Sequence, residues 1–106
     1  MKVVLTNTAA ADGERIARKL VEEHVVACVN LYPVRSVYFW KEQVHLDEEV
    51  MLIMKVGQEG VDRLQRRLRE LHPYELPEFV VLEVDVQASS RAYVDFVRQG
   101  TQREIP

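Results

Sequence analysis

The sequence predicts an α+β fold: a ferredoxin-like βαββαβ sandwich with a long central β-hairpin and a short C-terminal helix. Two observations predict it. Segments with strand-like and helical periodicity follow one another in the order β-α-β-β-α-β, and the two central strands are far longer than the others if they run their full length. The chain has 106 residues and no linker or internal repeat, so we expect a single domain over residues 1–106.

The first half of the pattern begins with a strand and a helix. Residues 3–5 form a short apolar run typical of a buried strand. From Glu14 the pattern is helical, and Asp12 is a plausible N-cap. The helix is predicted by one apolar stripe, which consists of Ile16, Ala17, Leu20 and Val21.

Two long apolar segments follow, over residues 25–40 and 49–56, and polar residues separate them. Pro33 interrupts the first segment, which predicts an edge strand or a bulge. If both strands run their full length, each approaches about 15 residues, whereas typical strands have about five or six. Two helices of about three turns cannot bury such strands. We therefore expect the surplus apolar surface around residues 38–40 and Met51 to form the interface of a closed homo-oligomer.

The second half predicts a helix, a strand and a terminal helix. Apolar residues recur at helical spacing from Val61 to Leu71, and Pro73 ends that helix. Residues 79–86 alternate as a last strand. Ser89 or Ser90 can cap the terminal helix.

Composition excludes several classes of protein. The net charge of -3 argues against a general nucleic-acid binder, which would be basic. No stretch approaches the ~20 apolar residues that span a bilayer, and the N-terminal apolar run is too short for a signal peptide. Cys28 is the only cysteine, so no internal disulfide can form and a reducing, cytoplasmic location is the simpler expectation.

Several segments together resemble the CutA family, which is named for tolerance to divalent cations such as copper. They are Ala27-Cys28-Val29-Asn30, Pro33, Ser36-Val37-Tyr38-Phe39-Trp40, Glu49, Lys55, His72-Pro73-Tyr74-Glu75-Leu76-Pro77-Glu78 and Tyr93. The resemblance implies a ferredoxin-like protomer and a compact PII-like homotrimer with clefts between subunits. The chain departs from the family pattern at Glu42, where relatives often have Gly, and at Val56 and Phe96.

Candidate metal ligands are the imidazole of His72, the thiol of Cys28 and the carboxylates of Glu49 and Glu75. Imidazole suits copper and zinc, and one imidazole with carboxylates gives a labile site. Each ligand also has a purely structural interpretation: His72 can complement a helix C-terminus, and Cys28 can be a small buried apolar residue. Further side chains are expected to line the cleft or to form an interface polar network: Tyr38, Trp40, Lys55, Tyr74 and Glu78.

The leading hypothesis is therefore a trimeric divalent-cation tolerance protein that binds metal ions such as copper weakly at an intersubunit cleft. We expect no catalytic activity, no required cofactor, and no nucleic-acid or membrane partner. One alternative is a PII-like small-molecule sensor. Another is an acylphosphatase-like enzyme, although residues 6–11 lack the Arg and the glycine cluster which that chemistry needs. A third is an RNA-binding module, which the acidic charge balance disfavours.

Overall fold

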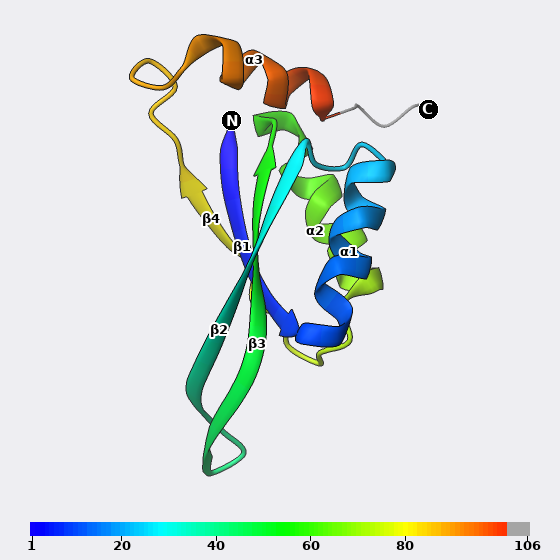
Figure 1. The fold of residues 1–106 in the computed structure, drawn as a ribbon, viewed down its shortest axis with the longest axis vertical. Helices are drawn as coiled ribbons and strands as arrows, with labels where there is room; N and C mark the ends of the chain where they lie inside the picture. Colours follow the sequence, from blue (N-terminus) through cyan, green and yellow to red (C-terminus); the bar gives the residue numbers. More distant parts are fainter. Residues whose placement is uncertain (102–106) are drawn as a thin grey trace.

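A four-stranded antiparallel sheet carries two helices on one face, and a third helix lies across one end (Figure 1). The structure is a computed structural model and describes residues 1–101. Its elements are β1 (Lys2–Ala9), α1 (Ala10–Glu22), β2 (Cys28–Trp40), β3 (Gln43–Val56), a 3₁₀ turn (Gln58–Gly60), α2 (Val61–Leu71), β4 (Val80–Glu83) and α3 (Arg91–Gly100). The strand order β2-β3-β1-β4 confirms the ferredoxin-like topology.

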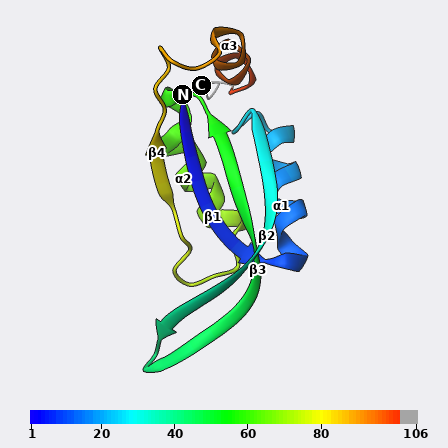
Figure 2. The ribbon, with the colours of Figure 1, turned by 60° about the vertical axis from the view of Figure 1, so that its left-hand side comes forward.

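The core lies between the sheet and the pair α1 and α2, which cover the same side of it (Figure 2). Side chains alternate along β3, so that Leu52, Met54 and Val56 point to the helices and are fully buried. The apolar stripes of the helices pack against these residues, and their buried members include Ile16, Leu20, Leu64 and Leu68. Helical periodicity in the sequence therefore identified the correct faces, except that Val21 of the predicted stripe is exposed.

The central hairpin is as long as the sequence predicts, with 13 residues in β2 and 14 in β3. Its register is unbroken from Cys28 opposite Lys55 to Trp40 opposite Gln43. The pairing of β1 with β3 stops at Glu49, so the remainder of the hairpin projects beyond the sheet (Figure 1). Pro33 lies in β2, which is an edge strand, and the constant register shows no bulge.

The turn of the hairpin is made by Lys41 and Glu42, which both have left-handed backbones, with φ of 49° and 65°. Such paired left-handed residues are typical of the two-residue hairpin turns that match the twist of the strands. Glycine adopts this conformation without strain, whereas other residues do so at a cost. Glu42, where relatives often have Gly, thus holds a left-handed conformation at a cost in strain.

Several expectations about element boundaries were wrong. The hairpin strands begin at Cys28 and Gln43 and not at residues 25 and 49, because the polar residues before Glu49 also pair with β2. The first helix begins at Ala10, directly after β1, so Ala9 and not Asp12 is the N-cap. Asp12 lies within the first turn instead, where a carboxylate complements the helix dipole. The first strand is longer than the three residues expected, because it continues to Ala9 as the partner of β3.

The last strand is shorter than expected, covering four residues and not eight. Its partner β1 begins at Lys2, which pairs with Glu83, so the following residues have no strand beside them. Beyond the strand, Asp85 accepts a hydrogen bond from the backbone N–H of Ala88. The expected cap at Ser90 is confirmed, since its hydroxyl accepts a hydrogen bond from the Tyr93 backbone.

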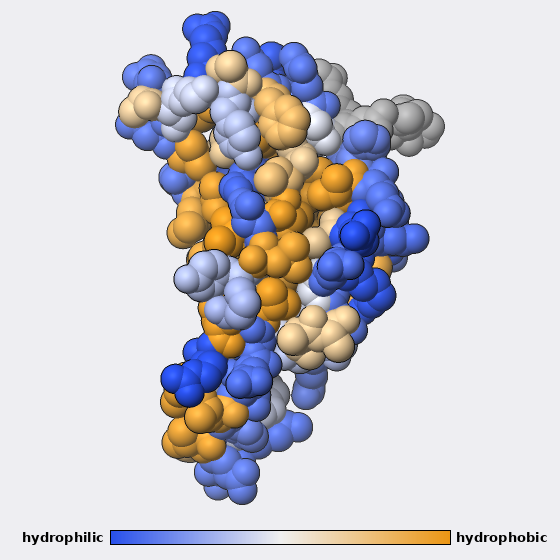
Figure 3. Space-filling model, viewed as in Figure 1, coloured by the Kyte–Doolittle hydropathy of each residue, from blue (hydrophilic) through white to orange (hydrophobic). Residues whose placement is uncertain are grey.

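Apolar residues remain exposed where no helix covers the strands. Figure 3 shows them gathered over the strands in the centre of the view and again on the projecting part of the hairpin. On that part, the exposed fractions are 69% for Val37, 70% for Phe39 and 71% for Val44. Contiguous apolar surface of this kind marks an interaction site.

Candidate functional site

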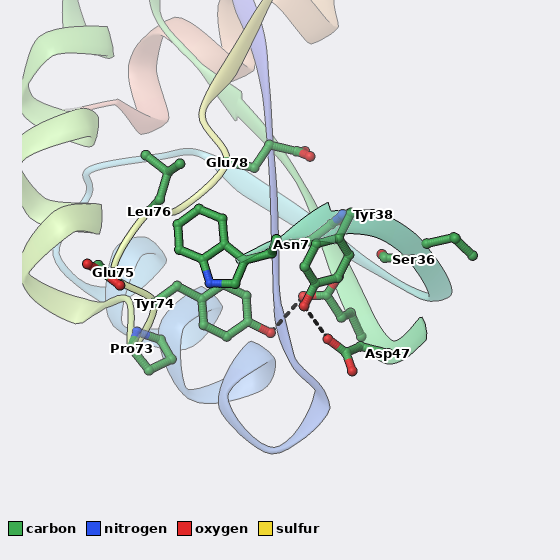
Figure 4. A pocket seen from close by; sticks show the side chains of 12 residues that line it. Asn7, Ser36, Tyr38, Asp47, Pro73, Tyr74, Glu75, Leu76 and Glu78 are labelled. Atoms are coloured by element: carbon green, nitrogen blue, oxygen red, sulfur yellow. Dashed lines mark hydrogen bonds between the residues drawn. The ribbon is translucent and has the colours of Figure 1, made fainter. Parts of the chain in front are cut away.

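A hollow of about 770 Å³ lies between the projecting hairpin and the loop that connects α2 to β4 (Figure 4). The hairpin bends so that one of its faces lies opposite residues 73–78 of that loop. Strand alternation explains the choice of side chains, because residues two apart share a face. Ser36, Tyr38 and Trp40 therefore line the hollow from β2, opposite Tyr74 from the loop, and Val37 between them also borders it.

Four carboxylates line the same pocket: Asp47, Glu49, Glu75 and Glu78. The first two lie on β3, on the face that they share with Tyr38 across the hairpin. No Lys, Arg or His is among the lining residues that the structure describes. The pocket is therefore strongly acidic, and it is bounded by three aromatic rings.

The phenols are bonded to two of these carboxylates. Tyr74 donates a hydrogen bond to Glu49 at 2.6 Å, and Tyr38 donates one to Asp47 (Figure 4). Burial, followed by the hydrogen bond to Glu49, raises the pKa of Tyr74 well above its ordinary value. The hydrogen bond to Asp47 raises the pKa of Tyr38. Both phenols therefore stay protonated and act as fixed donors.

Glu78 differs from the other acids in its surroundings. Burial, with the nearby negative charge of Glu49, raises the pKa of Glu78. A carboxylate that is partly desolvated beside another carboxylate gains from any cation that approaches it. The pocket thus carries an excess of negative charge.

His72 lies behind the wall of the pocket and is only 7% exposed. Its Nε2 lies 2.8 Å from the carbonyl oxygen of Asn7 and must donate to it. Its Nδ1 accepts from the backbone N–H of Tyr74 at 3.2 Å, and the two rings meet edge to face. Burial lowers the pKa of His72. The neutral ring thus fastens the loop to β1, and it could bind a metal only by giving up one of these bonds.

The structure separates two of the predicted site residues from the rest. Cys28 pairs with Lys55 at the far end of the hairpin, six residues along β3 from Glu49, a span of about 20 Å. There Lys55 donates a hydrogen bond to Asn30. His72 lies behind the wall of the pocket, and the remaining six candidates line it: Tyr38, Trp40, Glu49, Tyr74, Glu75 and Glu78.

Within residues 1–101, no group of three or more His, Cys, Asp and Glu side chains is arranged so that it could hold a metal ion. The four candidate ligands of one chain therefore form no complete metal centre among themselves. Sequence reasoning also missed Asn7 and Asp47, which line the pocket. The spacing of Asp47, two residues before Glu49, was the available signal, since it places both carboxylates on one face.

Comparison with known structures gives the class of protein first. The PII-like protein CutA from Nostoc sp. PCC 7120 superposes with a TM-score of 0.94 at 62% identity, covering 96% of this chain and 98% of that chain. The CutA1 structure from Pyrococcus horikoshii superposes with a TM-score of 0.91 at 29% identity, covering 97% of this chain and all of that one. The fold is thus that of the PII-like proteins.

The family model described as CutA1 divalent ion tolerance protein matches residues 1–100. The divalent-cation tolerance protein CutA of Thermus thermophilus is 36% identical over 100 residues, which are 93% of this chain and 95% of the relative. This chain belongs to the CutA1 family, as the sequence motifs predict. No helix among the described residues is long and apolar enough to cross a membrane.

Proposed function

We propose that this protein assembles into a closed homotrimer, that its intersubunit clefts bind divalent cations such as copper weakly, and that it acts by binding and not by catalysis. The observation that carries the proposal is the hairpin that projects beyond its own sheet. Its outer part has apolar residues that no other part of residues 1–101 covers, and it forms one wall of the acidic pocket. A partner copy that covers the hairpin would therefore also border the pocket.

Both edges of the sheet support assembly into a ring. The outer strands β2 and β4 each have one side without a strand neighbour, and Val80, Val81 and Leu82 of β4 are all more than 40% exposed. These two edges are different surfaces. Contact between different surfaces of identical subunits is heterologous, and a ring is the closed form of such contact.

The carboxylates of the pocket supply the oxygen ligands for a weak cation site. Glu49 and Glu75 are retained as ligands from the sequence prediction, and Glu78 and Asp47 join them in the pocket. His72 would add a nitrogen only after losing its bond from Tyr74, and Cys28 would add a thiolate only from a neighbouring subunit. A site built mainly from oxygen atoms binds copper and zinc weakly and exchanges them readily.

The direct entry of β1 into α1 also supports binding over catalysis. An acylphosphatase-like mechanism needs an anion-cradling loop after the first strand, whereas here α1 begins at the residue that follows β1. No loop of that kind exists at this position. The pocket itself is acidic and suits cations.

Two experiments test the proposal. Light scattering should give the mass of a trimer for the wild type and a smaller mass for Phe39→Glu, whereas Val21→Glu, on the helical face, should leave the mass unchanged. Calorimetry with copper chloride should show weaker binding by Glu49→Gln than by the wild type, with Glu48→Gln as the control of equal charge outside the pocket. A monomeric mass for the wild type would refute the proposed trimer. Equal copper binding by the wild type and all variants, His72→Ala included, would refute the proposed copper site.

A further inference from the structure

We propose that the acidic pocket binds an organic ammonium ion, a cation with N–H groups and an apolar carbon body. The inference rests on the pocket of the proposed function but not on metal binding. It follows from the size of the pocket, from its aromatic walls, from a count of its hydrogen-bond donors and acceptors, and from an ammonium group of the chain itself that already lies at its rim.

The size and walls of the pocket fit a molecule better than an ion. Its volume of about 770 Å³ lies in the range of small-molecule sites. A metal ion with six waters needs about 200 Å³, at about 30 Å³ for each water. The rings of Tyr38, Trp40 and Tyr74 offer apolar and π surface, which a hydrated metal ion does not use. An alkylammonium ion uses both aromatic faces and carboxylates.

The polar groups of the pocket call for a ligand that brings donors. The hydroxyls of Tyr38 and Tyr74 already donate to Asp47 and Glu49. Oδ1 of Asn7 is buried, and among the described residues it has no hydrogen-bond partner. Ionised carboxylates can only accept hydrogen bonds. The other side-chain donors of the lining are the indole N–H of Trp40, the amide NH2 of Asn7 and the hydroxyl of Ser36, and the four carboxylates offer more acceptor sites than these can fill. An ammonium group provides several N–H donors together with the missing positive charge.

The ammonium group of Lys41 already lies near both an aromatic ring and a carboxylate of the pocket. Its Nζ lies 5.7 Å from the centroid of the Trp40 ring and 3.8 Å from Oε2 of Glu75. This is the arrangement in which a cation gains from an aromatic face and a carboxylate together. The Lys41 side chain is 72% exposed, so a ligand can displace it. Lys41 therefore acts as a weak internal competitor.

The test uses the full chain at neutral pH, with 1,5-diaminopentane as the probe. Trp40 is the only tryptophan, so its fluorescence reports on the pocket directly. We expect a saturable change with the diamine and none with 1,5-pentanediol, its neutral match. Magnesium chloride, which has the same charge without a carbon body, should not reproduce the change.

Three substitutions in or beside the pocket and one control outside it sharpen the test, with calorimetry as the readout. Lys41→Met should tighten diamine binding by about 3- to 10-fold, because the internal competitor is gone. Trp40→Leu and Glu78→Gln should each weaken it by about 3- to 30-fold, whereas Glu48→Gln should leave it unchanged. Lys41→Met and Glu78→Gln keep the test valid if Trp40→Leu fails to fold.

Equal binding of the diol and the diamine, no binding of the diamine, or weaker binding by Lys41→Met would overturn the inference. Copper binding without diamine binding refutes the organic ligand and leaves the proposed metal function standing. Diamine binding without copper binding refutes the metal function and supports the organic ligand.

Discussion

The phenol oxygen of Tyr74 lies 2.6 Å from a carboxylate oxygen of Glu49, and this bond joins the loop after α2 to the strand β3. Among the residues of β3 that pair with β1, Glu49 is the one nearest the hairpin turn. The bond therefore lies where the hairpin leaves the sheet. Glu49 is only 8% exposed. A buried carboxylate at this position depends on its donor, and the shape of the pocket depends on the bond.

Replacing Tyr74 by Phe should lower the free energy of unfolding by about 1–3 kcal/mol, because a buried carboxylate loses its donor. Urea denaturation at a fixed protein concentration measures the change. Tyr32→Phe, at a side chain that is 64% exposed, is the matched control and should change it by less than about 0.5 kcal/mol. Equal effects of the two substitutions would show that the bond to Glu49 contributes nothing.

The protein should lose stability as the pH falls below the ordinary pKa of histidine. Burial lowers the pKa of His72 in the folded state, so the unfolded chain takes up a proton first. The contribution of His72 is complete above about pH 6.5. It declines by at most about 1.4 kcal/mol per pH unit as the pH falls from there to the folded pKa.

Urea unfolding of the wild type and of His72→Gln at pH 7.5 and pH 5.0 checks this. The variant should depend less on pH, since Gln keeps a donor for the Asn7 carbonyl but does not titrate. Glu78 has a raised pKa and therefore acts in the opposite direction, but it does so in both proteins. A variant that depends on pH as steeply as the wild type would contradict the prediction.

Gly13 allows α1 to approach the sheet closely. A Cβ at this position would lie 2.3 Å from Cγ1 of Val50. Gly13→Ala should therefore destabilise the protein by about 1–3 kcal/mol through overpacking, although Ala favours a helix by about 1 kcal/mol. Thermal or urea unfolding of Gly13→Ala with and without Val50→Ala is the test. The Ala at position 13 should be harmless once Val50 is shortened, and a stabilised single variant would refute the contact.

Glu42→Gly should stabilise the hairpin turn. Glu42 has a φ of 65°, which costs a residue with a side chain about 1–2 kcal/mol. Gly removes this strain but gives back about 0.5–1 kcal/mol through the entropy of the unfolded chain. We expect a net gain near 0.5–1 kcal/mol in urea unfolding. Glu48→Gly, in the extended strand, should be destabilising, and the same sign for both would contradict a special role of the turn.

Sequence reasoning identified the elements whose pattern is local and strongly periodic. The apolar spacing from Val61 to Leu71 sufficed to define α2, and the long apolar runs defined the hairpin. It failed for β1 because Thr6 and Thr8 appear polar, yet both are fully buried against the helices. It placed the start of α1 too late, since a helix that begins on alanines directly after a strand has no capping signal.

The candidate site was predicted only in part, because residues on the same face of a strand can still lie far apart along it. Lys55 and Glu49 do lie on one face of β3, as the even spacing indicates. Six residues of extended chain nevertheless separate them by about 20 Å. Asn7 belongs to the pocket only through the pairing of β1 with β3, and such a long-range register is not visible in a single sequence.

The hairpin also has a consequence for the order of folding. Its strands are joined by two residues, so pairing can spread from the turn without closing a long loop, whereas β1 meets β4 only after most of the chain is in place. We expect the hairpin to form early, which Trp40 fluorescence in stopped-flow refolding would detect. The exposed apolar part of the hairpin would then form first and stay uncovered until the proposed assembly takes place. Aggregation through this surface would compete with assembly, and dilution would lengthen the time for which the surface stays uncovered.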